Sequence, residues 1–323
     1  MTKEMSEIPS GLLNIDKPEG RTSRDVVNRI QWLLRKRIGV RKIKVGHCGT
    51  LDPLATGVLV LGVGSSTRLM TRVQQHRKTY SGTFLLGCAT NTDDVTGETI
   101  RETPIAPGEF DADSIRKLLP EFTGRISQVP PVFSAVHVDG KRAYELARKG
   151  KEVEIAPREV DVYSLEVTRF DDSSPPEFDL CVECGSGTYI RSLGRDIGER
   201  LGCGATMSAL SRSGIGPFEL QEAVPLGELD QENILDSLQP SAVAVCHLPT
   251  RILDEEETRR IRSGRDIPRG SFEPPRLRAE SADLNEEVAL LSSTGELIAV
   301  GAPGKIPGTL KPATVFHGPP DPL

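Results

Sequence analysis

GHCGTLDPLATG, residues 46–57, is the stretch that says most about this chain. Its glycines bracket His47 and Asp52, which indicates an irregular backbone or one that another group approaches closely. Pro53 disfavours the helical region for the residue before it, so Asp52 is expected in an extended or turn conformation. The apolar run 58–63 follows. A carboxylate beside apolar chain is costly unless it is paired, so we expect Asp52 to need a partner.

On residue types alone, two interpretations of Asp52 stay open. In one, the aspartate is part of an Asx turn and bonds only to its own backbone. In the other, it is a catalytic carboxylate. A metal pair made by His47 and Asp52 is a further alternative, but two ligands are too few for a metal site.

The segment GSGTYIR, residues 185–191, offers a partner for this carboxylate. Tyr189 and Arg191 are two residues apart, so in an extended stretch both project to the same side. Arg191 could then form a bidentate guanidinium–carboxylate pair with Asp52. The ordinary alternatives are a tyrosine within a sheet and an arginine that faces solvent. Aromatic residues are scarce, and base stacking on an aromatic ring contributes about 1–3 kcal/mol per base, so Tyr80 and Tyr189 draw notice.

Hydrophobic periodicity predicts strands and helices in irregular alternation, which is typical of an α+β fold with a largely antiparallel or mixed sheet. A Thr22–Asp25 capping box begins one helix, and Pro120 is expected to stop another. The predicted strands are 11–17, 80–88, 178–184, 288–291 and 297–300, and the predicted helices are 22–38, 111–119, 140–149 and 190–201.

Length and charge bound the class of protein. The chain has 323 residues, and at about 150 residues per domain this predicts about two domains. The net charge of −6 argues against a nucleic-acid binder, but the charge is uneven. Residues 21–50 carry nine bases and one acid, whereas residues 219–236 carry six acids and no base. This asymmetry suggests one surface that faces a polyanion; the alternative is a solvated helix face.

Several classes are disfavoured by what the sequence lacks. No apolar run approaches the roughly 18 residues of a membrane helix, and the N-terminal segment MTKEMSEIPS has no apolar core, so we expect no signal peptide. The cysteines are then expected to be reduced thiols in the cytoplasm. The pair Cys181-x-x-Cys184 has no second pair to complete a zinc site. We therefore expect no metal.

Five segments together resemble one family. They are GLLNIDKPEGRTSRDVV, GHCGTLDPLATGVL, RKTYSGTFLLG, QVPPVFSAVHVDGKRAYELARKG and GSGTYIRSLGRDIG, in this order along the chain. They closely resemble the tRNA pseudouridine synthase B family, over residues 11–247. The family isomerises the position-55 uridine in the T loop of tRNA to pseudouridine. The resemblance implies a pseudouridine-synthase fold with a mixed, mainly antiparallel central sheet and a small C-terminal β domain of the PUA type.

The family pattern implies roles for individual residues. Asp52 matches the nucleophilic aspartate, Tyr80 the tyrosine against the target base and Arg191 the arginine paired with the aspartate. Four further positions are implied to bind substrate or support the site: Lys17, His47, Tyr189 and Leu210. The motif around Leu210 usually continues with two arginines; here Ser211 takes the first place and Arg212 the second.

The insertion at about 128–155 is expected to contact RNA. Its predicted helix, flanked by Gly140 and Gly150, would carry Arg148 and Lys149 on one face and close over the tRNA as a lid. The alternative is a rigid surface hairpin that never touches RNA.

The resemblance also implies an organisation and a set of partners. We expect a catalytic domain over 11–249, a small domain and Pro/Gly-rich tail over 250–323, and a cytoplasmic monomer. It would act on the T arm of tRNA without guide RNA, obligatory protein partner, membrane, metal or organic cofactor. The residues leave open whether the aspartate attacks C1′, adds to C6 or removes a sugar proton. Two competing hypotheses remain open. One is a non-catalytic RNA-binding protein or tRNA-folding chaperone, and the other is a metal-dependent hydrolase.

Overall fold

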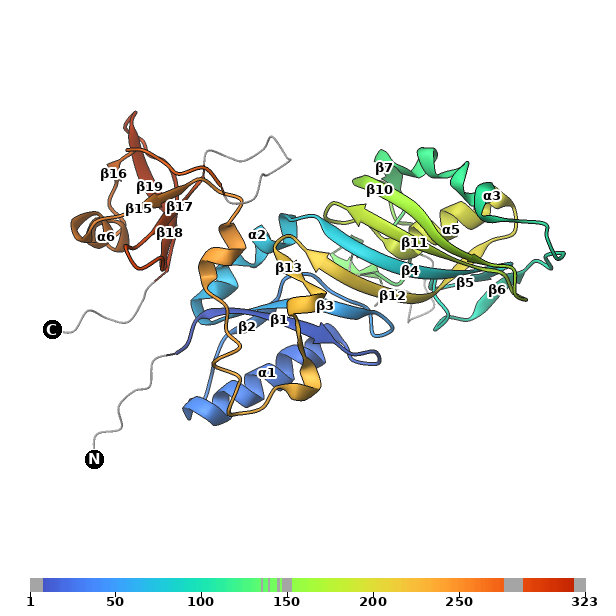
Figure 1. Cartoon of the computed structure of the whole chain (residues 1–323), viewed down its shortest axis with the longest axis horizontal. Coiled ribbons are helices and arrows are strands. Elements are labelled where there is room, and N and C mark those ends of the chain that lie inside the picture. Colours follow the sequence, from blue (N-terminus) through green and yellow to red (C-terminus); the bar gives the residue numbers. More distant parts are fainter. Residues whose placement is uncertain are drawn as a thin grey trace.

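The computed structural model of this chain describes residues 8–134, 136–138, 140–143, 146, 153–275 and 287–316. Figure 1 shows an elongated molecule with a large twisted sheet at its centre and one end, and a smaller sheet at the other. Among the helices of these residues, none combines the length and the apolar character that a bilayer crossing requires.

The large sheet takes its strands from most of the chain, so residues far apart in sequence become neighbours. Its strands are β1 (Gly11–Lys17), β2 (Val45–His47), β3 (Thr56–Val63), β4 (Lys78–Leu86), β7 (Gly124–Gln128), β10 (Arg158–Asp171), β11 (Glu177–Cys184), β12 (Ala205–Ile215), β13 (Phe218–Glu219) and β14 (Val224–Pro225). The order is β14-β1-β3-β12-β4-β11-β10-β7, with β2 paired to β3 and β13 to β12. Two pairs, β1 with β14 and β3 with β12, are parallel, and the others are antiparallel. The predicted α+β fold with a mixed, mainly antiparallel sheet is confirmed.

The short parallel contact between β3 and β12 joins the two halves of the sheet. It pairs Ser211 with Thr56 and Arg212 with Gly57, at the end of the GHCGTLDPLATG stretch. Gly57 has φ +93°, and a Cβ there would lie 2.3 Å from the Arg212 carbonyl oxygen. Only glycine allows this approach, so the loop before β3 is fixed against β12.

Two helices cover the sheet where the sequence predicts them. Helix α1 (Ser23–Ile38) begins with the Thr22–Asp25 capping box, and its apolar stripe is buried. Helix α5 (Ile190–Leu201) ends at Gly202 in the left-handed conformation. It lies so close to β4 that a Cβ on Gly194 would meet the Phe84 ring at 2.0 Å. The first turn of α5 is therefore fixed relative to the sheet.

The remaining short elements lie around the large sheet. They are η1 (Gly64–Leu69), α2 (Met70–Gln75), β5 (Cys88–Thr90), β6 (Thr99–Glu102), α3 (Ala112–Arg116), η2 (Leu119–Phe122), β8 (His137–Val138), β9 (Lys141–Arg142), η3 (Leu220–Glu222), η4 (Leu226–Glu228) and η5 (Ser241–Val245).

The smaller sheet confirms the predicted C-terminal β domain. It has the order β15-β17-β18-β19-β16. Its elements are β15 (Thr250–Ile252), α6 (Glu255–Arg262), β16 (Ile267–Pro268), β17 (Val288–Leu291), β18 (Leu297–Pro303) and β19 (Thr309–Val315). Strands β17 and β18 pair as the sequence predicts.

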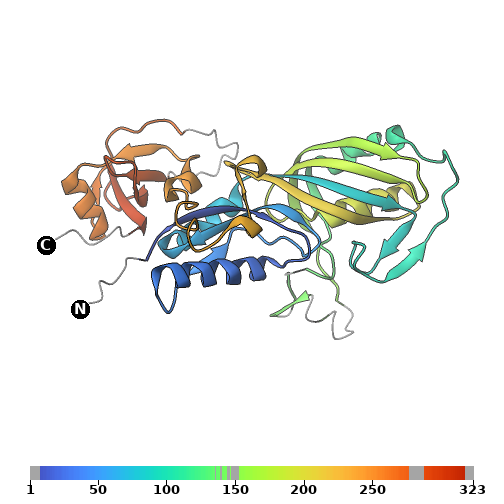
Figure 2. The same cartoon turned by 60° about the horizontal axis from the view of Figure 1, so that its bottom comes forward.

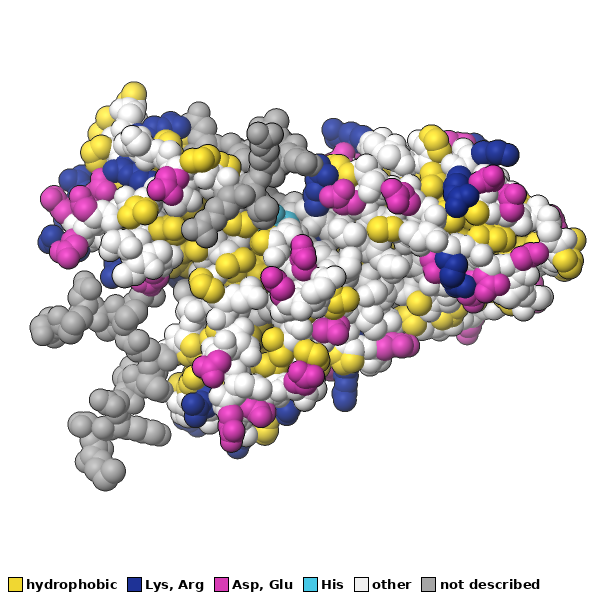
Figure 3. Space-filling model, in the orientation of Figure 1, with side chains coloured by type: hydrophobic (Ala, Val, Ile, Leu, Met, Phe, Trp, Pro, Cys, Tyr) yellow, Lys and Arg dark blue, Asp and Glu magenta, His cyan; other side chains and the backbone are white. Residues whose placement is uncertain are grey.

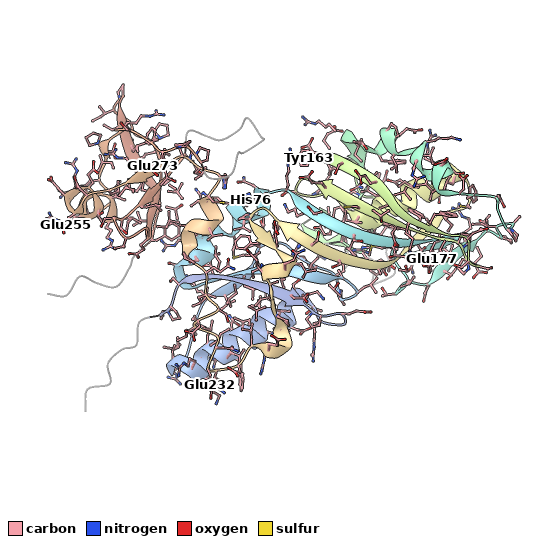
Figure 4. The ribbon with its side chains drawn as sticks, viewed as in Figure 1. His76, Tyr163, Glu177, Glu232, Glu255 and Glu273 are labelled. Atoms are coloured by element: carbon pink, nitrogen blue, oxygen red, sulfur yellow. The ribbon has the colours of Figure 1, made fainter. Side chains whose placement is uncertain are left out.

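The junction between the two sheets is packed. Buried side chains of β3, α2 and η5 share one apolar cluster with Ala289 and Val300 of the smaller sheet. Arg72 makes two hydrogen bonds to the carboxylate of Glu287 across this junction. Beside it the rings of His76 and His247 meet edge to face at 4.5 Å, and Figure 4 shows His76 at this place.

Three boundaries predicted from the sequence were wrong. The helix predicted at 111–119 ends at Arg116, and Pro120 lies in the first turn of η2, where its missing N–H costs nothing. The strand predicted at 80–88 runs from Lys78 to Leu86.

The helix predicted to begin at Gly140 also differs. Gly140 has φ +77° between β8 and β9, which pair as a hairpin, so Lys141 and Arg142 are in a strand. Within the rest of that predicted helix, 143 and 146 are helical, and the remaining positions lie outside the described residues.

Candidate active site

The loop that carries Asp52 is pinned at both ends by backbone contacts. Ser23, in the first turn of α1, accepts from the Leu51 amide through its hydroxyl at 2.9 Å and donates to the Leu51 carbonyl at 3.1 Å. The Gly20 amide donates to the Pro53 carbonyl at 2.8 Å, and the Ala55 amide to the Asp52 carbonyl at 3.1 Å. Asp52 therefore begins a tight turn, as its position before proline predicts, and its side chain keeps 37% of its surface exposed.

Lys17 holds this loop from the end of β1. Its side chain is fully buried at the end of β1, and Nζ donates to the carbonyls of Pro18, Arg21 and Pro53. Burial lowers the pKa of Lys17 to about 8, and the nearby Asp52 carboxylate partly opposes this. Lys17 thus ties the turn after β1 to the residue that follows Asp52.

Arg191 lies between two carboxylates. Its Nη2 is 3.0 Å from Asp52 Oδ2, and its Nη1 is 3.3 Å from Asp94 Oδ2. The guanidinium also donates to the carbonyls of Thr92, at 2.8 Å, and Phe133, at 3.1 Å. The Arg191 side chain is 7% exposed, so these contacts fix its position. The structure thus forms the Asp52–Arg191 pair that the sequence suggested.

Sequence reasoning missed Asp94. It is buried, and Thr92 and Thr96 donate to its Oδ1 through a hydroxyl each, with the Thr96 amide as a further donor at 3.0 Å. A signal existed, since NTDDVTG places threonines two residues before and after Asp94, a typical turn arrangement. Asp94 shares the charge of Arg191 with Asp52.

Tyr80 and Arg212 face each other across neighbouring strands. Arg212 is 1% exposed; its Nε donates to the Val58 carbonyl at 2.7 Å and its Nη2 to the Gly49 carbonyl at 3.3 Å. Its Nη1 lies 3.5 Å from the Tyr80 hydroxyl. Burial raises the pKa of Tyr80, so the phenol stays protonated. Arg212 therefore holds the loop before β3 at Gly49 and positions the Tyr80 ring.

His47 ends β2 at the other side of the loop. Burial, and then the charges of Arg24 and Arg212, lower the pKa of His47, so the ring is neutral at pH 7. Its Nδ1 is buried and has no hydrogen-bond partner among the described residues. Cys48 beside it is fully buried, and burial raises the pKa of its thiol to about 12. Cys48 is thus a packing residue.

Comparisons with known proteins agree with this geometry. A family model described as TruB family pseudouridylate synthase (N terminal domain) matches residues 35–190, and one described as tRNA pseudouridylate synthase B C-terminal domain matches residues 191–249. The tRNA pseudouridine synthase B of Paenarthrobacter aurescens (strain TC1) is 43% identical over 294 residues, which are 90% of each chain. This chain belongs to the TruB family. The resemblance drawn from its motifs is confirmed.

Further relatives and solved structures cover nearly all of this TruB-family chain. The tRNA pseudouridine synthase B of Dehalococcoides mccartyi is 39% identical, with 96% of this chain and 97% of that one covered. A structure titled as an H/ACA RNP bound to a substrate RNA containing 2′-deoxyuridine is similar with a TM-score of 0.67 and 25% identity, over 95% of this chain and 85% of that chain. A Cbf5-Nop10-Gar1 complex gives a TM-score of 0.65 and 28% identity, over 90% and 78%.

The TruB resemblance also singles out Tyr189, Leu210, Arg148 and Lys149. Tyr189 is the residue before α5 and packs beside Val136, Ala143 and Ile155, whereas Arg191 lies in the first helical turn and faces Asp52. The expectation that both project to one side of an extended stretch was therefore wrong, because the helix begins between them. Leu210 is buried on β12, two residues before Arg212. Arg148 and Lys149 lie outside the described residues.

Cys181 and Cys184 do not lie on the same face of β11. They alternate on β11, with Cys184 buried and Cys181 partly exposed. In the part of the chain that the structure describes, no group of three or more His, Cys, Asp or Glu side chains could hold a metal ion.

Proposed function

We propose that this TruB-family chain isomerises uridine to pseudouridine at position 55 of the T loop of tRNA, with Asp52 as the reacting carboxylate. One observation carries the proposal: Asp52 is presented on a rigid loop, part of its carboxylate is exposed, and the buried Arg191 holds it as an ion pair. The names of the relatives, tRNA pseudouridine synthase B, support the reaction and its substrate.

The reaction suits these residues. The C1′–N1 bond breaks, a C1′–C5 bond forms, C5 loses a proton and N1 gains one, so no electrons are exchanged with another molecule. An ionised aspartate is needed whether it attacks C1′, adds to C6 or removes a sugar proton. Arg191 places a positive charge beside the Asp52 carboxylate. Tyr80 and His47 lie on the strands beside the loop. We propose that both contact the base of the target uridine.

The basic stretch at 21–44 is the part of the surface that we assign to tRNA phosphates. Its nine bases are all exposed, and within the described residues none of them takes part in an ion pair. Basic side chains that neutralise phosphates release the counterions bound to the nucleic acid. The helix that carries many of them begins at Ser23, which holds Leu51 beside Asp52, so this surface borders the site.

The acidic stretch lies beside the same helix. Leu229 and Ile234 are buried in one cluster with the inner face of α1, and Figure 4 shows Glu232 next to α1. On the face drawn in Figure 3, acidic and basic side chains are interspersed in this region. We infer that the acidic stretch bounds one side of this basic surface.

We propose that residues 11–249 form the catalytic unit, that the insertion at about 128–155 contacts the T arm, and that residues 250–323 form the small second unit. We also propose that the chain works as a cytoplasmic monomer, without guide RNA or an obligatory protein partner. The TruB relatives match over nearly their whole length, which supports the same organisation for this chain.

The test is incubation of the purified chain with an unmodified tRNA transcript, followed by mapping of pseudouridine. We expect one modified site, at position 55, and none in a transcript with cytidine there. A chain that binds the transcript but forms no pseudouridine would be a non-catalytic RNA-binding protein or folding chaperone, and the proposal would fail. Modification at another position would overturn the proposed specificity alone.

A further inference from the structure

Gln128, the last residue of β7, is hydrogen-bonded to the residue that precedes α5. Its side chain is 2% exposed. Its Oε1 accepts from the Tyr189 amide at 2.8 Å, and its Nε2 donates to the Tyr189 carbonyl at 3.1 Å. One amide side chain thus satisfies both backbone groups of the residue that precedes α5.

This contact supports a helix start that has no side-chain cap. Tyr189 is the N-cap residue of α5, and its side chain makes no capping hydrogen bond. Its carbonyl also accepts the first helical bond, from the Leu193 amide at 3.2 Å. Gln128 therefore fixes the backbone two residues before Arg191, where the helix would otherwise begin unsupported.

The residues after Gln128 extend the same contact. The Val129 carbonyl accepts from Ser192 Oγ and from Arg195 Nη2, each at 2.9 Å. The Phe133 carbonyl accepts from Arg191 Nη2 at 3.1 Å. Segment 128–133 and the first two turns of α5 are thus joined by a row of hydrogen bonds, which Gln128 begins.

The consequence for the carboxylate follows from geometry. Arg191 Nη2 is shared between Asp52 and the Phe133 carbonyl, so a shift of segment 128–133 or of the helix start moves the guanidinium relative to Asp52. Misplacing a reacting group by about 1 Å can cost about 100-fold in rate. A side chain that never touches substrate can therefore control the chemical step.

We propose that Gln128 is a positioning residue: it sets the start of α5 so that Arg191 holds Asp52 in its reactive orientation. The inference rests on the roles proposed above for Asp52 and Arg191. A purely structural role for Gln128 predicts a loss of stability with an unchanged rate for the folded fraction. A positioning role predicts a slower chemical step in a folded protein that still binds tRNA.

The main variant is Gln128→Met, which keeps the volume of the side chain and removes both hydrogen bonds. The second is Gln128→Glu, which keeps the acceptor for the Tyr189 amide but loses the donor to its carbonyl. The matched control is Asn14→Leu, since Asn14 is equally buried and its Nδ2 donates to the Glu219 carbonyl at 2.9 Å, away from α5.

The measurements are the single-turnover rate of the full-length chain at saturating tRNA transcript, the tRNA dissociation constant and the thermal midpoint. We expect Gln128→Met to lower the rate by about 30-fold or more, and Gln128→Glu to lower it less. The dissociation constant should stay within about threefold, and Asn14→Leu should match the parent in rate and dissociation constant.

Unchanged rates in both Gln128 variants, or an effect confined to the dissociation constant, would overturn the proposal. If Gln128→Met does not fold, the rate of Gln128→Glu decides. Asp52→Asn, measured alongside, distinguishes failure of the proposed site from failure of this inference. An active Asp52→Asn enzyme would contradict the proposed site itself. An inactive Asp52→Asn enzyme together with normal Gln128 variants would contradict only the role of Gln128.

Discussion

The catalytic loop and the β8–β9 hairpin are held to the molecule in opposite ways. The loop around Asp52 is bonded from four separate elements, by Lys17, Ser23, Arg191 and Arg212. All four side chains are buried. Because buried polar bonds have defined geometry and are costly to break, the backbone of the loop is fixed, and Arg191 holds the carboxylate that it presents.

The hairpin has much less to hold it. Its strands have two residues each, and its buried cluster in the described residues consists of Val136, Ala143 and Ile155. Figure 2 shows the hairpin, in light green, projecting from the large sheet. Such sparse burial gives low local stability. The difference teaches that the Asp52 carboxylate is preorganised, whereas the described residues of the hairpin, within the insertion that we assign to RNA contact, have few buried contacts.

The largest effect should come from the centre of the rigid region. Asp52→Asn keeps the shape of the side chain, but an amide acts neither as nucleophile nor as base. We expect pseudouridine formation to fall below detection, and the tRNA dissociation constant to change by less than about tenfold. Pseudouridine mapping and filter binding measure the two. Clear turnover by this variant would remove the distinction on which the comparison rests.

The second effect tests how far the rigid region extends. Asp94→Asn removes the other carboxylate on Arg191, so the guanidinium loses one of its two charged anchors. We expect the single-turnover rate to fall by about tenfold. Asp93→Asn is the matched control, because Asp93 pairs with Arg195 instead and asparagine tolerates its φ of +61°. Equal rates for the two variants would limit the preorganised site to Asp52 and Arg191.

The third effect belongs to the insertion. Changing Arg148 and Lys149 together to Glu should weaken tRNA binding and flatten the slope of affinity against salt, because two phosphate contacts are lost. The single-turnover rate at saturating tRNA should hold, and so should the thermal midpoint. If affinity and slope equal those of the parent, the insertion is a surface hairpin and the tRNA lies elsewhere.

The smallest effect concerns the junction of the two sheets. Burial, with His247 nearby, lowers the pKa of His76 to about 4, against an ordinary value of about 6.5. The unfolded chain therefore takes up a proton before the folded one does, and stability falls as pH drops from about 6.5 to about 4.

Replacing His76 by Phe keeps a ring but removes this titration. We expect the fall in thermal midpoint between about pH 7 and about pH 5 to be smaller in the variant than in the parent, by about 2 °C or more. Calorimetry at the two pH values measures it, and activity at pH 7 serves as the check on the catalytic region. Identical falls would assign the acid sensitivity to other groups.

Elements with strong local signals were predictable from the sequence. The capping box at Thr22 and the buried stripe gave α1, and the strict alternation at 178–184 gave β11. Proline after Asp52 indicated its turn. These features depend on a few neighbouring residues, so they survive without knowledge of the tertiary structure.

What failed depends on pairing or on a competing local signal. The pair Asp139-Gly140 is a typical hairpin-turn sequence, and Lys141 and Arg142 pair in a strand where the helix was expected to begin. Asp94 and Gln128 contact residues at the start of α5, a helix far away in sequence. The threonines around Asp94 mark its turn, but its contact with Arg191 follows only from the fold. Arg212 was within reach, because alternation places it on the same face of β12 as Leu210.

The contacts around the catalytic loop also order events during synthesis of the chain. Asp52 leaves the ribosome early, yet Arg191 and Arg212 emerge well over a hundred residues later. The first strand waits longer still, since Leu12 exchanges two backbone hydrogen bonds with Gln239. A nascent chain therefore carries Asp52 without the groups that orient it while well over a hundred further residues are made. The protein can first act on tRNA only after nearly the whole catalytic region has been made and released.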